Sequence, residues 1–134
     1  MIKDLIPNFD REKRFIGRII LPLIFKKNAM YIYNITLNVD ESIHDDWIIW
    51  MQDIHIPEVL STGKFTKALM SEVLVEEELG GITYSVQFTC SSKKHLLEYY
   101  EKDAPRLRED SYKKFGNKFG AFRTEMKIIK EFYS

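Results

Sequence analysis

The chain has 134 residues, of which 45% are apolar and 30% charged, as expected for one globular domain large enough to bury a core. Its formal net charge is zero, so composition gives no reason to expect nucleic acid as a partner. A single cysteine, Cys90, excludes an internal disulfide and fits a reducing cytoplasm, where we expect the protein to reside. We expect Cys90 itself to be a small buried residue of a strand.

Residues 1–29 differ from the rest of the chain, because they carry seven basic and three acidic side chains. Their apolar run, residues 15–25, is interrupted by glycine, arginine and proline and is shorter than the roughly 20 residues of a membrane-spanning helix. Three interpretations are open: a basic arm that contacts a membrane surface or a partner, a poorly ordered tail, or a mis-assigned start. We favour the last two, because regular periodicity begins at Met30. The domain is therefore expected at 30–134.

The first regular segment, residues 30–39, alternates between apolar or aromatic and polar residues, which predicts a strand. Residues 40–42 have acidic and short polar side chains that suit a helix N-terminus. The helix that follows, about residues 42–60, carries apolar residues at spacings of three and four: Ile43, Trp47, Trp50, Met51 and Ile54.

Pro57 lies within this helical pattern, where a proline removes a backbone hydrogen bond. We therefore predict a kink near His55–Pro57, a restart with Pro57 in the first turn, and an end at Gly63. Residues 65–77 and 82–90 are predicted to form two further strands. The pair Gly80-Gly81 between them predicts a hairpin, because primed turns need positive φ at both positions.

A second helix is predicted over residues 93–115, capped by Ser92 and interrupted near Asp103–Ala104 by Pro105. A last strand is predicted over residues 119–132. The resulting order, β-α-β-β-α-β, is that of the ferredoxin-like α+β fold. It predicts a four-stranded antiparallel sheet in the order 4-1-3-2 with two helices on one face. The other face needs a cover, and a homodimer through that face is the simplest solution.

Five segments occur in chain order: MYIYNITLNVDESIHDDWIIWM, HIPEVLSTGKF, VLVEEELGGITYSVQF, YYEKDAPRLRE and AFRTEM. They resemble a family of short bacterial proteins known only as a domain of unknown function, from Met30 to about Ile129. The family pattern usually begins at the equivalent of Met30. The resemblance implies a dimeric α/β barrel, in which two ferredoxin-like sheets pack face to face, and no known activity. More loosely, the first helix is similar to that of stress-response and small monooxygenase-like barrel proteins, whose helix–sheet cleft holds small aromatic or haem-like ligands.

His55 is the candidate catalytic residue. It follows Met51 by four residues and Trp47 by eight, so the three side chains share one helical sector. An imidazole titrates near neutrality and suits a general base or a ligand-binding group. The alternative is a structural histidine that bonds backbone groups freed by Pro57.

Further candidate ligand-binding residues are aromatic, sulfur-containing or amide side chains expected near the same cleft. They are Trp47, Trp50 and Met51 on the helix, and Tyr33 and Asn34 on the first strand. The alternative for each is an ordinary position in the core or the sheet. The three histidines have no metal-ligand spacing, and no motif predicts a cofactor.

Two functional hypotheses follow. The first is a homodimeric α/β-barrel protein that binds a small apolar or aromatic molecule or acts as an interaction module. The second is a cofactor-independent enzyme, similar to an oxygenase or isomerase, that uses His55 as acid or base. Membrane contact through residues 1–29 is a third, less favoured, option.

Overall fold

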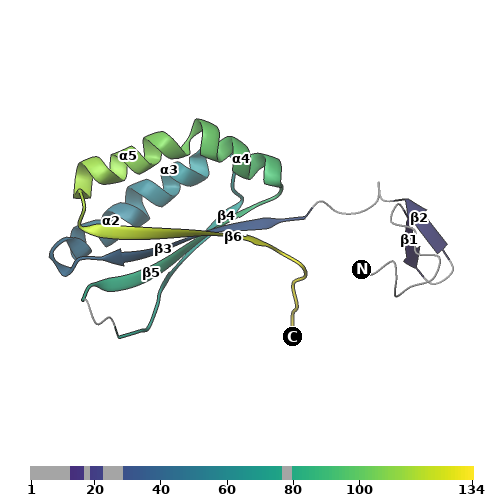
Figure 1. Ribbon diagram of the computed structural model, residues 1–134, viewed down its shortest axis with the longest axis horizontal. Helices are drawn as coiled ribbons and strands as arrows, with labels where there is room; N and C mark the ends of the chain where they lie inside the picture. Colours follow the sequence, from purple (N-terminus) through teal and green to yellow (C-terminus); the bar gives the residue numbers. More distant parts are fainter. Residues whose placement is uncertain (1–12, 17–18, 23–28, 77–79) are drawn as a thin grey trace.

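A computed structural model describes residues 13–16, 19–22, 29–76 and 80–134 (Figure 1). Within the N-terminal extension, β1 (Lys13–Ile16) and β2 (Ile19–Pro22) pair antiparallel. The other residues up to 28 lie outside the described part, and so do the predictions of a tail or a membrane-binding arm that concern them.

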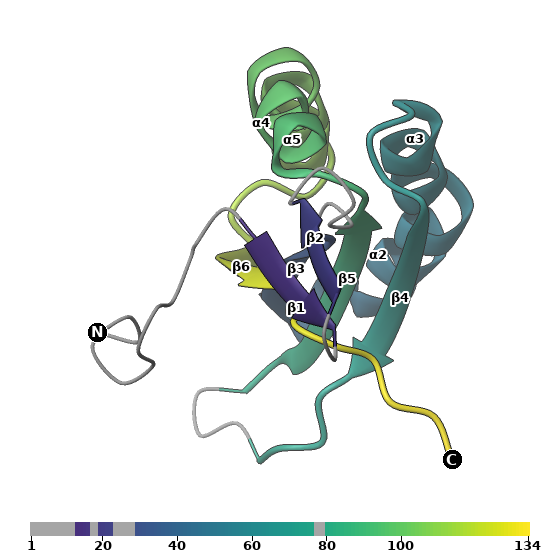
Figure 2. The same cartoon turned by 90° about the vertical axis from the view of Figure 1, so that its right-hand side faces the viewer.

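The domain is built on one four-stranded antiparallel sheet. Its strands are β3 (Tyr31–Val39), β4 (Lys67–Glu72), β5 (Ile82–Cys90) and β6 (Phe119–Lys127). They lie in the order β4-β5-β3-β6, which confirms the predicted ferredoxin-like topology. All the helices of the domain lie on one side of this sheet (Figure 2).

The first helical segment contains four consecutive elements: η2 (Glu41–Ile43), α2 (His44–Trp50), the π-helical turn η3 (Met51–His55) and α3 (Ile56–Ser61). Pro57 lies in the first turn of α3, as predicted. The predicted kink takes the form of the widened η3 turn, in which the Ile56 N–H bonds to the Met51 carbonyl five residues earlier. In a regular helix the proline ring would clash with the carbonyl four residues before it, and the wider turn relieves that clash.

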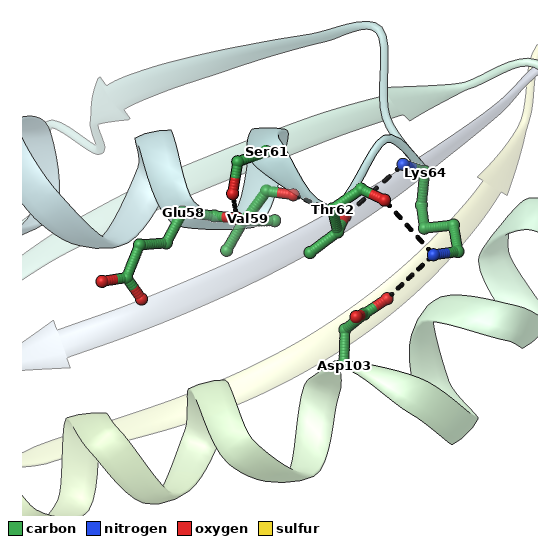
Figure 3. A network of polar contacts seen from close by, with 6 residues as sticks. All are labelled: Glu58, Val59, Ser61, Thr62, Lys64 and Asp103. Carbon is green, nitrogen blue, oxygen red and sulfur yellow. Dashed lines mark hydrogen bonds and ion pairs between the residues drawn. The ribbon is translucent and has the colours of Figure 1, made fainter.

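The second helical segment breaks where Pro105 predicts. Helix α4 (Lys93–Lys102) ends at Asp103, and α5 (Ala104–Phe115) begins directly after it. The Ser92 hydroxyl accepts the His95 N–H and caps α4. Figure 3 shows how the break is tied to the end of α3: the Lys64 ammonium donates to the Asp103 carboxylate at 3.2 Å and to the Thr62 carbonyl at 3.3 Å.

Two strands are shorter than predicted. Strand β4 stops at Glu72 rather than residue 77, although the Val73 N–H still bonds to the Thr83 carbonyl. Strand β6 stops at Lys127 rather than residue 132, because its neighbour β3 begins at Tyr31. The predicted hairpin joins β4 to β5, but its connection is longer than two residues.

Both glycines of that connection have positive φ, 82° at Gly80 and 80° at Gly81. At Gly81 a Cβ atom would also lie 2.6 Å from the Asn38 side-chain oxygen. The position therefore requires glycine for its backbone conformation and for the close approach of β3.

The core lies between the helices and the sheet. Cys90 is fully buried within it, as predicted, and burial raises the pKa of its thiol. The largest completely buried side chains come from all the layers of the fold: Trp47, Phe88, Leu96, Leu107, Val39, Val59, Val86 and Cys90.

Candidate functional site

A narrow pocket with a cavity volume of about 50 Å³ lies between the helical layer and the sheet. Strand β3 contributes Tyr33, Ile35 and Leu37, which alternate toward the helices. The walls are mainly apolar and aromatic, as is usual for small-molecule sites. The polar and charged side chains that line the pocket are His55, Tyr33, Tyr99, Tyr112, Ser111, Arg108 and Arg123.

His55 lies in the wall of this pocket at the end of the π-helical turn. Its ring stacks on Trp50, with centroids 4.7 Å apart and planes at 23°. Its Nδ1 atom is buried and has no hydrogen-bond partner among the described residues. Burial lowers the pKa of His55 to about 4, against a smaller opposing effect of the Asp110 charge. The imidazole is therefore neutral at pH 7.

The π-helical turn is the local cause of this placement. Widened turns of this kind occur frequently at functional sites because they alter the position of the side chains that follow. Here the turn ends at His55 itself, and Pro57 in the next turn keeps the geometry from returning to a regular helix. The Nδ1 atom of His55 does not bond to a backbone group freed by the proline, because it has no partner among the described residues.

A second polar group in the pocket centres on the hydroxyl of Tyr33. The Arg108 Nη2 donates to this oxygen at 3.1 Å from α5, and the Arg123 Nε donates at 3.0 Å from β6. The Tyr33 side chain is 3% exposed, and its ring packs against those of Phe65 and Tyr100. Packing therefore holds the hydroxyl in place, while both guanidinium groups reach it from the rim.

The rim beside Tyr33 is lined by Tyr100, Arg108, Arg123 and Glu125. Glu125 forms an ion pair with Lys93. Burial raises the pKa of Tyr100, and the nearby Glu125 charge adds to that rise, so the phenol stays protonated at neutral pH. Burial likewise raises the pKa of Tyr99 deeper in the pocket.

Four of the six predicted site residues line this one pocket: His55, Trp47, Met51 and Tyr33. Trp50 does not line it and instead packs against the ring of His55 and against Phe115. Asn34 faces the opposite side of the sheet. Its amide donates to the Thr36 hydroxyl at 3.1 Å and accepts the Ser85 hydroxyl at 2.6 Å.

Sequence reasoning missed Arg108 and Arg123 as site residues. Arg108 looked like one of several cations near the end of a helix. For Arg123 a signal was present in the last strand, where residues 121, 123, 125 and 127 alternate with Phe122, Thr124 and Met126. The register places the charged set on the helix side and the apolar set on the open side, so an arginine on that strand borders the core.

No group of three or more His, Cys, Asp or Glu side chains in the described ranges is arranged to hold a metal ion. Among the helices that the structure describes, none is long and apolar enough to cross a membrane.

The architecture defines the chain as an α+β protein of ferredoxin-like fold. It belongs to the family described as a domain of unknown function, DUF4286, whose sequence profile matches residues 30–129. The solved structures similar to it include an ethyl tert-butyl ether degradation (EthD) family protein from Bacillus halodurans. The TM-score is 0.54 at 11% identity, over 70% of this chain and 96% of the other.

A dimeric ferredoxin-like protein from an uncultured marine organism is similar with a TM-score of 0.49 and 10% identity, over 78% of this chain and all of the other. Identities this low relate the folds alone, and the second likeness is too weak to support an inference. No curated protein matches the sequence significantly.

Proposed function

We propose that the protein is a small-molecule-binding protein whose site is the pocket between helix and sheet. The observation that carries the proposal is the meeting of an apolar cavity with two separate polar features, the unpartnered His55 and the Tyr33 hydroxyl with its two arginines. An unpaired buried nitrogen is unfavourable in a filled core, because a buried polar group without a partner costs about 1–3 kcal/mol.

His55 serves in this proposal as a neutral hydrogen-bonding group. Its neutral form has one donor and one acceptor nitrogen, and Nδ1 is unpaired. A hydroxyl or amide of a ligand that reaches this nitrogen recovers the free energy lost by burying it. The aromatic wall of Trp47, with Met51 beside it, favours a ligand with a flat or flexible apolar body.

A cofactor-independent enzyme is the second candidate, and the presence of a neutral imidazole, a phenol and two guanidinium groups in one pocket favours it. His55 would accept a proton from a bound molecule, and the arginines would stabilise the charge that develops. The low pKa weighs against this role, because an imidazole with a pKa of about 4 is a weak base at neutral pH.

We also propose that the protein is a homodimer through the uncovered face of the sheet. On this face the edge strands carry Leu69, 61% exposed, Phe122, 69% exposed, and Met126, 37% exposed. A second copy related by twofold symmetry would cover all three. Sedimentation equilibrium at micromolar concentration should give a dimer mass, and a purely monomeric species would contradict this.

A thermal-shift screen of small apolar and aromatic compounds tests the binding function. A true ligand should stabilise the wild type and stabilise His55→Ala much less. His95→Ala is the matched control, because this histidine lies in α4 outside the pocket, where its ring contacts the Ser92 hydroxyl. A compound that stabilises all three proteins equally does not bind at His55, and a broad screen without any stabilising compound would contradict the proposal.

A further inference from the structure

We infer that Arg108 and Arg123 form a receptor for the anionic head of the ligand, so that the pocket takes a small organic carboxylate with an apolar body. This inference rests on the proposed binding function and deepens it by naming the charge and the polarity of the ligand.

The first support is the convergence of the two side chains. Arg108 comes from the middle of α5 and Arg123 from the middle of β6, yet each donates to the same oxygen of Tyr33. Because each donor nitrogen lies about 3 Å from that atom, the two nitrogens lie within about 6 Å of each other. Each guanidinium uses one of its five N–H groups in this bond, which leaves several donors on both for a further acceptor.

The second support is the local charge. Within the described ranges, neither Arg108 nor Arg123 forms an ion pair with a carboxylate, although several acidic residues lie on the same elements. Those acids are engaged elsewhere: Asp110 with Arg106, Glu109 with Lys113, and Glu125 with Lys93. Two like charges that share one neutral acceptor repel each other, and an anion placed between them offsets that repulsion.

Among the residues that the structure describes, Glu125 is the one acidic group that lines the rim beside the arginines. Its ion pair with Lys93 holds it toward β3, where that ammonium also lies over the Tyr31 ring. A carboxylate ligand would therefore contact two guanidinium groups and Glu125, whose charge is paired with that of Lys93. This leaves an excess of positive charge at the rim. Tyr100, protonated at neutral pH, adds a hydroxyl without adding a charge.

The third support is the continuity of the rim with the interior. Tyr33, Arg108 and Arg123 line both the polar rim and the apolar pocket that extends to Trp47 and Val59. A carboxylate on the arginines would thus place its apolar body toward the aromatic wall. The planar guanidinium fork matches a carboxylate in two parallel hydrogen bonds, which an ammonium group cannot do. This geometry favours a small amphipathic acid over an acidic protein surface, which would remain at the rim.

The test uses pairs of probes that differ only in charge: phenylacetate with phenylacetamide, 3-phenylpropanoate with its amide, and octanoate with octanamide. Calorimetry on the wild type should give at least about tenfold tighter binding for the acid of a pair, and that preference should weaken with added salt. Arg123→Gln and Arg108→Gln should each abolish most of the preference, because each should weaken binding of the acid far more than binding of its amide. Arg123→Lys should restore part of it. Arg106→Gln, outside the pocket, is the control for a change of surface charge.

The outcomes separate the two proposals. Equal binding of acid and amide by the wild type would overturn the anion receptor and leave the binding pocket intact. Equal losses for acid and amide in the glutamine variants would do the same, and circular dichroism of each variant shows whether it is folded. Binding of none of the six probes would contradict both proposals. Binding of poly-glutamate but of no small acid would assign the arginines to an acidic protein partner and overturn the inference.

Discussion

The two faces of the four-stranded sheet present different kinds of side chain. On the helix face, β3 and β5 present large apolar and aromatic side chains, and the polar groups gather in one pocket. On the open face the same central strands present mainly amides and hydroxyls, and the exposed side chains of Leu69, Phe122 and Met126 lie on the edge strands. Burial of a polar residue alone therefore does not identify a binding site. Asn34 is 8% exposed on the open face but both polar atoms of its amide form a hydrogen bond, whereas His55 on the helix face keeps a buried nitrogen unpaired.

The largest expected effect separates the two faces by stability. Trp47→Ala should lower the free energy of unfolding by about 3–5 kcal/mol, because it removes a side chain that is 1% exposed and leaves a cavity. Leu69→Ala on the open face should cost less than about 1 kcal/mol in the monomer. Urea denaturation at protein concentrations below the dissociation constant of the dimer measures both free energies. Comparable losses would contradict the assignment of the core to the helix face.

The next effect is a pH dependence that belongs to the helix face. The pKa of His55 is lowered to about 4 in the folded protein and is near 6.5 when unfolded. As pH falls from about 6.5 to 4, His55 takes up a proton in the unfolded chain but not in the folded protein. The free energy of unfolding therefore decreases over that pH range. The loss is about 3 kcal/mol at most.

His55→Gln should flatten this profile, since the variant has no imidazole to protonate. Denaturation curves of the wild type and the variant from pH 7.5 to 4 give the difference directly, and subtraction removes the contributions of other groups. Parallel profiles would mean that His55 is accessible to solvent and titrates normally.

A smaller effect is expected on the open face at Asn34. Asn34→Ala removes two hydrogen bonds and leaves the partner hydroxyls of Thr36 and Ser85 to find others, so we expect a loss of about 1–2 kcal/mol. Because the residue lies outside the pocket, ligand binding should be unchanged. A loss of binding with stability retained would move the site toward the open face.

The smallest effect on the stability of the monomer is expected for Phe122→Asp, which changes a side chain that is 69% exposed. Its unfolding free energy as a monomer should stay within about 0.5 kcal/mol of the wild type. Its effect on self-association should be large, because a carboxylate would enter an apolar contact. Sedimentation velocity should show a monomer for the variant and a dimer for the wild type, and a dimer in both would place the interface elsewhere.

The fold could be predicted from sequence because its signals are local. Short-range chemistry explains the alternation in β3 and β5, the Ser92 cap and the break at Pro105. Together these signals indicate the order of helices and strands along the chain, from which the fold is predicted. The ends of β4 and β6 could not be predicted in the same way. Strand β6 ends where its neighbour β3 begins, and that depends on register between distant segments.

The candidate site was predictable only in part, for a similar reason. Helical spacing brought His55, Met51 and Trp47 together, since all three lie on one segment. The arginines that meet at Tyr33 are 75 and 90 residues away from it in sequence, and only the tertiary structure unites them. Asn34 is predicted to line the cleft, although neighbouring residues of a strand such as Tyr33 and Asn34 point to opposite faces. The structure places Asn34 on the open face.

The most direct test of the central claim, that the helix–sheet pocket is a ligand site built around His55, is a titration followed by imidazole nitrogen NMR. Long-range ¹H–¹⁵N spectra resolve the three histidines in the presence of increasing 3-phenylpropanoate or 3-phenylpropanamide. We expect the His55 nitrogens to shift in a saturable way while those of His44 and His95, outside the pocket, stay constant. Saturable binding that shifts His44 or His95 and leaves His55 unchanged would contradict it.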